Sequence, residues 1–106
     1  MKQFGDVTSK DGKSQRSWTD KNTCHVGVLI EGKLREIYRV ELVNAIPTNG
    51  KPARDEIHVS DMLDEGHWFA PTVERKPATA APKTAITLLA KKYERLARKQ
   101  LLSRRP

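Results

Sequence analysis

Four side chains of this sequence could bind a soft metal ion through sulfur or imidazole nitrogen: Cys24, His25, His58 and His67. Cys24 and His25 are adjacent, so on a β-strand they would point to opposite faces and could not both bind one ion. None of the four forms a pair with the short loop spacing of zinc ligands. We therefore expect no metal and no cofactor, and we interpret His25 and His58 as polar-face strand residues.

A second set of residues could support hydrolysis of a phosphodiester. Glu31-Gly32-Lys33 follows an apolar run, and Asp20 lies upstream as a second carboxylate. Two carboxylates can hold a metal ion, and a nearby lysine can face the scissile phosphate. This pattern resembles the end of a restriction-endonuclease-type active site and implies a metal-dependent nuclease. Such a site needs Glu31 and Lys33 inside a central strand, whereas Gly32 favours a turn. We therefore expect no enzyme activity, and a nuclease stays as an alternative.

The strongest signal for binding is the distribution of charge. The chain carries 20 Lys and Arg against 13 Asp and Glu, a formal net charge of +7. Residues 1–82 contain 12 of each kind, whereas residues 83–106 contain eight basic residues and one acid, Glu94. All of the net charge therefore lies in the last 24 residues. Concentrated charge of one sign is typical of a segment that meets an anionic partner.

These basic residues fall on a predicted amphipathic helix over residues 85–103. Cations that can reach phosphates of a nucleic-acid backbone are Lys91, Lys92, Arg95, Arg98, Lys99, Arg104 and Arg105. Such contacts give binding that depends on salt and little on base sequence. The sequence therefore predicts a non-enzymatic nucleic-acid-binding accessory protein, and it does not distinguish DNA from RNA. Whether Trp68 stacks on bases or belongs to the core stays open.

The opposite face of this helix is an apolar stripe that needs a partner of its own. Ile86, Leu89, Tyr93 and Leu96 recur in steps of three and four residues, as the a and d positions of a coiled coil do. The stripe could pack on this chain's own sheet, on a second copy or on a different protein. The alternative function is accordingly an adaptor or inhibitor that docks this helix on an acidic protein. An anionic lipid surface is a further candidate.

Two stretches of alternating apolar and polar residues, within residues 23–43, predict an antiparallel hairpin with its turn at Glu31-Gly32-Lys33. A third strand is expected at 56–60. Three prolines within residues 71–83 predict an extended spacer. The expected organisation is a polar N-terminal segment (1–17), a small antiparallel β domain (18–70), the spacer (71–83) and the basic helix with its tail (84–106). The fold class is therefore α+β, with three to four strands.

Composition limits the size of the core. Hydrophobic residues make up 37% of the 106 residues, below the roughly 45–50% typical of globular domains. A core formed by about 60–70 residues is marginally stable alone, so a homodimer is a candidate state. The start of the chain has no apolar stretch of the kind that signal peptides use. The longest apolar run is also far shorter than the ~20 residues of a membrane span. We therefore expect a soluble, cytoplasmic protein.

Overall fold

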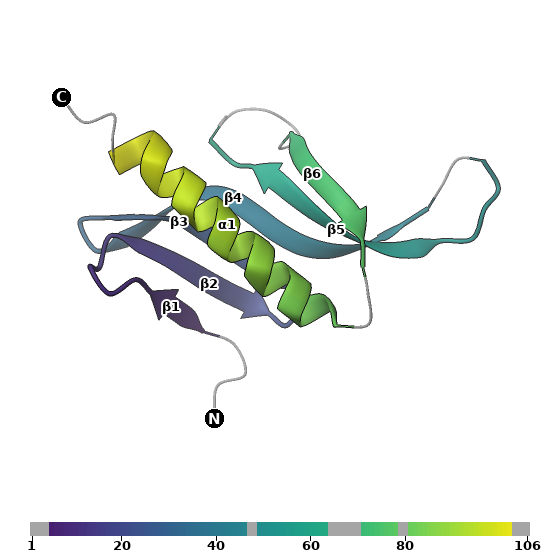
Figure 1. Ribbon diagram of the computed structural model, residues 1–106, viewed down its shortest axis with the longest axis horizontal. Coiled ribbons are helices and arrows are strands. Elements are labelled where there is room, and N and C mark those ends of the chain that lie inside the picture. The colour runs from purple at the N-terminus through teal and green to yellow at the C-terminus, as the bar shows by residue number, and fades with distance from the viewer. Residues whose placement is uncertain (1–4, 47–48, 64–70, 79–80, 103–106) are drawn as a thin grey trace.

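The computed structural model describes residues 5–46, 49–63, 71–78 and 81–102. These residues form a small α+β fold, with six antiparallel strands followed by a C-terminal helix. In chain order the elements are β1 (Asp6–Thr8), β2 (Ser14–Asp20), β3 (Thr23–Ile30), β4 (Lys33–Ala45), β5 (Arg54–Asp61), β6 (Thr72–Pro77) and α1 (Pro82–Leu102). Each strand pairs with the next one along the chain, and α1 crosses one face of the sheet (Figure 1).

The predicted central hairpin is confirmed. β3 and β4 are joined by Glu31 and Gly32, with φ angles of 53° and 78°. A two-residue connection with both residues in the left-handed region matches the right-handed twist of the strands. Glycine adopts this conformation without steric cost, so Gly32 fixes the turn and the register of the hairpin. The third predicted strand lies within β5, and the predicted helix corresponds to α1.

The number of strands differs from the prediction. The sequence predicts three to four strands within residues 18–70, and the structure has six. β1 and most of β2 lie in the segment expected to be a polar N-terminal extension, and β6 lies in the expected spacer. Pro71 directly precedes β6, Pro77 ends it and Pro82 begins α1. These are positions where a missing N–H or a fixed φ is tolerated, so the prolines bound elements that they do not prevent.

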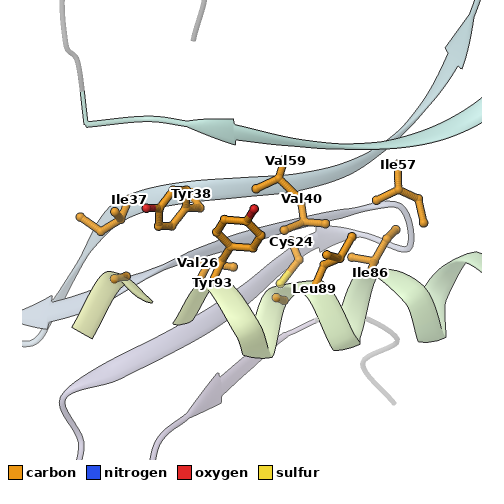
Figure 2. Close-up of a cluster of buried hydrophobic side chains, with 12 residues drawn as sticks. Cys24, Val26, Ile37, Tyr38, Val40, Ile57, Val59, Ile86, Leu89 and Tyr93 are labelled. Carbon is orange, nitrogen blue, oxygen red and sulfur yellow. The ribbon is translucent and has the colours of Figure 1, made fainter. Parts of the chain in front are cut away.

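The core lies between the sheet and α1 (Figure 2). The sheet contributes fully buried side chains from β3, β4 and β5, including Val26, Val40 and Ile57. From α1, Ile86 and Leu89 pack against them. Each such side chain contributes about 1.5–3 kcal/mol when it is removed from water. Because the apolar residues of α1 recur at helical spacing and those of the strands at every second position, the two surfaces match and close one core.

Two tyrosines extend this core toward the C-terminal end of α1. The rings of Tyr38 and Tyr93 meet edge to face, with centroids 4.7 Å apart (Figure 2). Gln100 donates a hydrogen bond from its side-chain amide to the Tyr38 hydroxyl, at 2.9 Å. The buried ring therefore keeps a partner for its polar end. A helix suited to spanning a membrane, with enough length and enough apolar residues, is not found in the described part of the chain.

A bulge in the hairpin requires glycine at one position. Val26 pairs with Tyr38 and Gly27 pairs with Glu36, so Ile37 is the extra residue of β4. At Gly27 the two strands come so close that a Cβ atom would lie 1.9 Å from the carbonyl oxygen of Arg35. This oxygen belongs to the backbone and cannot move aside without breaking the ladder. A side chain at position 27 is therefore incompatible with the bulge.

We predict that Gly27→Ala lowers the free energy of unfolding by about 3 kcal/mol or abolishes the cooperative transition, because the methyl group overlaps a backbone atom. Urea unfolding followed by far-UV circular dichroism measures the effect. Gly5→Ala is the matched control, since nothing lies within 4 Å of its Cβ position, and it should change stability by less than about 0.5 kcal/mol. Equal midpoints for the two variants would show that the close approach at Gly27 is not needed.

Candidate nucleic-acid interface

The apolar stripe of α1 packs on the chain's own sheet. Ile86, Leu89 and Tyr93 are buried in the core, whereas Leu96 is 37% exposed. Of the three partners left open by the sequence, the sheet therefore takes most of the stripe. This packing turns one side of α1 inward and decides which of its charged residues can meet a partner.

The only acid of the helix is turned inward. Glu94 accepts a hydrogen bond from the hydroxyl of Ser14 at 2.5 Å, and its other oxygen lies 3.1 Å from Nε of Arg16. Ser14 is fully buried, and the side chains of Arg16 and Glu94 are each only 14% exposed. This cluster ties α1 to β2. It also removes the one negative charge of the helix from its outer surface.

Arg98 is tied to the turn between β1 and β2. Its guanidinium lies 2.5 and 3.0 Å from the two carboxylate oxygens of Asp11 and donates to the Ser14 hydroxyl at 3.0 Å. Hydrogen bonds from Arg98, from Ser9 and from the Lys13 backbone hold the pKa of Asp11 far below its usual range. Arg98 therefore acts first as an internal contact.

Lys92 is tied to β6 on the other side of the helix. Its ammonium lies 3.2 Å from Oε1 of Glu74, and the Tyr93 hydroxyl donates to the same oxygen at 2.6 Å. The bond from Tyr93 is the main cause that lowers the pKa of Glu74, with Lys92 adding to it. Burial, and then the Glu74 carboxylate, raise the pKa of Tyr93 well above its usual range. Lys92 is thus tied to β6, and Arg98 to the turn between β1 and β2.

Three of the predicted cations form an exposed row along α1. Lys91, Arg95 and Lys99 are exposed and follow one another at four-residue intervals; we call them the outer ridge. Residues at this spacing are displaced by 40° around the helix and by about 6 Å along it. From Lys91 to Lys99, the outer ridge therefore places positive charge along about 12 Å of the helix axis. Arg104 and Arg105 lie outside the described residues.

The nuclease-like residues are not brought together. Glu31 lies in the two-residue turn that follows β3, and Lys33 is the first residue of β4. Asp20 pairs with Thr23 at the opposite end of β3. The length of a whole strand separates the two carboxylates, so they cannot share a metal ion.

His25 and His58 lie on the face of the sheet that α1 does not cover. His25 contacts the carboxylate of Glu36 through Nδ1 and Thr19 through Nε2, and Arg39 donates two hydrogen bonds of 3.1 Å to the same carboxylate. On β5, Nε2 of His58 lies 3.0 Å from Glu56. Both histidines are therefore partners of glutamates on this polar face. His67 and Trp68 lie outside the described residues.

Cys24 is buried in the core, where loss of hydration raises the pKa of its thiol to about 12. The thiol is thus protonated and packs as an apolar side chain. Within the described ranges, no three His, Cys, Asp or Glu residues gather in a group that could hold a metal ion.

No protein-family model, no curated protein and no solved structure matches this chain. A function must therefore be argued from its own surface. The outer ridge belongs to the described surface, and sequence reasoning found it only as part of a larger set of cations. The ties of Lys92 to Glu74 and of Arg98 to Asp11 join residues far apart in the sequence, and no local pattern signals them.

We predict that Glu94→Ala lowers the free energy of unfolding by about 2 kcal/mol, because it leaves the buried Ser14 hydroxyl without its hydrogen-bond acceptor and the Arg16 guanidinium without its ion-pair partner. Urea unfolding at pH 7 measures the change. Lys92→Ala is the control, since the Lys92 side chain is 51% exposed and an exposed ion pair contributes about 0–1 kcal/mol. A loss no larger than that of the control would contradict the role of Glu94 as a helix anchor.

Glu36, on the face of the sheet opposite α1, gives a separate prediction for the stability of the fold at acidic pH. Partial burial acts to raise the pKa of Glu36, but hydrogen bonds from His25 and Arg39 outweigh it and lower the pKa below the ordinary 4.5. The carboxylate thus stabilises the fold above pH 4.5, and this contribution is lost as the pH falls through the lowered pKa. In Glu36→Gln the unfolding free energy should lack this contribution and its dependence on pH. The difference in unfolding free energy between wild type and variant should therefore shrink from about pH 6 to about pH 3; a constant difference would disprove the coupling.

Proposed function

We propose that this protein is a non-enzymatic nucleic-acid-binding accessory protein that contacts the phosphate backbone through the outer ridge of α1. The observation that carries the proposal is the sorting of charge on the helix. Lys91, Arg95 and Lys99 are exposed, whereas the side chain of Glu94 is only 14% exposed and pairs with Arg16 of β2. A surface that served solubility alone would mix both signs.

The physical basis of binding is the release of counterions. Each cation that neutralises a phosphate displaces a condensed ion, so the affinity falls steeply as salt is added. Contacts of this kind fix position on the backbone and carry no base information directly. Binding should therefore be largely independent of sequence.

The fold supports this function by holding the helix in place. Leu89 packs α1 into the core between helix and sheet. On the side of α1 that faces β2, Glu94 forms an ion pair with Arg16, and Arg98 donates hydrogen bonds to Asp11. A helix that is already folded loses no backbone entropy on binding. The outer ridge thus presents its charges on a rigid support.

A second candidate is an adaptor or inhibitor that docks α1 on an acidic protein. It is favoured by Leu88 and Leu96, which are 62% and 37% exposed beside Lys92. An apolar contact next to cations suits an acidic protein groove better than a phosphate backbone. A homodimer formed through α1 could not use Ile86 and Leu89, because both are buried in their own chain.

We predict that replacing the whole outer ridge (Lys91→Ala, Arg95→Ala and Lys99→Ala together) weakens nucleic-acid binding about 100-fold at 0.1 M salt. The slope of log K against log salt should become shallower by about 2–3 units, since three phosphate contacts are lost. Fluorescence anisotropy with labelled single- and double-stranded DNA and RNA, at several salt concentrations, measures both quantities. Alanine keeps the helix intact.

The matched control removes three exposed lysines that lie outside α1 (Lys21→Ala, Lys33→Ala and Lys51→Ala) and so changes the net charge by the same amount. Its salt slope should stay close to that of the wild type. Wild-type binding by the ridge variant, or equal losses in the two variants, would reject backbone contact through α1. The acidic-protein candidate would then be tested with Leu88→Ala and Leu96→Ala.

A further inference from the structure

A small pocket lies beside the outer ridge, where the turn between β1 and β2 meets α1. Its volume is about 320 Å³. The residues that line it are Ser9, Lys10, Asp11, Ser14, Glu94, Arg95 and Arg98. The pocket thus brings residues near the two ends of the sequence to one place, and Arg95 belongs both to it and to the outer ridge.

The two carboxylates of the pocket already have partners. Asp11 is held by the guanidinium of Arg98, and Glu94 is held by Arg16 and Ser14. Their hydrogen-bond acceptors face these partners, and their charges are offset by two arginines. The lining therefore does not repel an anion as strongly as two unpaired acids would.

Two cations of the pocket are left without such partners. Lys10 and Arg95 are both exposed, and within the described part of the chain neither has an ion pair. Together with Arg98 they put three basic side chains around the opening. Ammonium and guanidinium groups are the donors that bind phosphate oxygens most strongly.

We infer that this pocket binds a phosphate group between Lys10 and Arg95, with Arg98 fixed beneath it by Asp11. The inference rests on the proposed function, in which the phosphate belongs to a nucleic-acid backbone that runs from the outer ridge onto the turn between β1 and β2. Lys10 thereby becomes a binding residue although it lies in the part of the sequence that has no net charge.

Arg98 is a positioning residue here. Its hydrogen bonds to Asp11 and Ser14 hold the turn against α1. Lys10 is next to Asp11 in the chain, so this contact also fixes the backbone that carries Lys10. The pocket is therefore built before a ligand arrives, and binding needs only the two exposed side chains to adjust.

The test compares Lys10→Ala with Lys13→Ala in the full-length protein. Both lysines are exposed on the same turn, but only Lys10 lines the pocket. Loss of one phosphate contact should weaken nucleic-acid binding about fivefold at 0.1 M salt and reduce the salt slope by about 0.7–0.9. Lys13→Ala should change the slope by much less. Equal effects of the two variants, or no effect of Lys10→Ala, would overturn the pocket.

Inorganic phosphate separates this inference from the proposed function. In a ¹H–¹⁵N NMR titration at constant ionic strength, phosphate should shift the signals of Lys10, Asp11 and Arg95 more than chloride does, and Lys10→Ala should remove the difference. Phosphate shifts in a protein that binds no nucleic acid would reject the proposed function and keep a free-phosphate pocket. Nucleic-acid binding that is lost only in the outer-ridge variant, without phosphate shifts, would reject the pocket alone.

Discussion

The packing of α1 against the sheet is the contact on which the rest of this structure depends. A six-stranded meander with one apolar face cannot be stable while that face meets water. Val26, Val40 and Ile57 on the sheet are covered by Ile86 and Leu89 of the helix. Since α1 supplies five of the twelve buried residues in the core cluster of the described part of the chain, the basic helix is part of the folded domain itself.

This packing also decides what the charges of the segment can do. An amphipathic helix could rotate by one position on an apolar surface at little cost, but polar contacts on both sides prevent it. Glu94 and Arg98 hold the side toward β2, and Lys92 holds the side toward β6. Only one orientation satisfies all three. The outer ridge is therefore a consequence of where the polar partners lie on the sheet.

The elements that could be predicted are those whose signals are local. The hairpin of β3 and β4 follows from alternating residues around Gly32, and α1 follows from its periodic apolar residues. β2 escaped prediction because its inward residues include Ser14 and Arg16, which look exposed until Glu94 provides their partner. β6 escaped for another reason: Pro71, Pro77 and Pro82 indicate an extended spacer, whereas in the structure they lie at the ends of β6 and at the start of α1. Strands whose buried positions are polar can be recognised only when the element that satisfies them is known.

The same reasoning changes how the charge of the sequence should be interpreted. Net charge counted along the chain assigns the whole excess to residues 83–106, yet a partner meets the surface and not the sequence. The charge of Arg98 is paired with that of Asp11. Lys10 belongs to residues 1–82, which carry no net charge, yet it lines the pocket together with Arg95. Ion pairing between distant elements therefore engages some cations within the fold, whereas Lys10 and Arg95 stay exposed. A basic surface has to be counted after these internal pairs are subtracted, because only the remaining cations can exchange their counterions for phosphates.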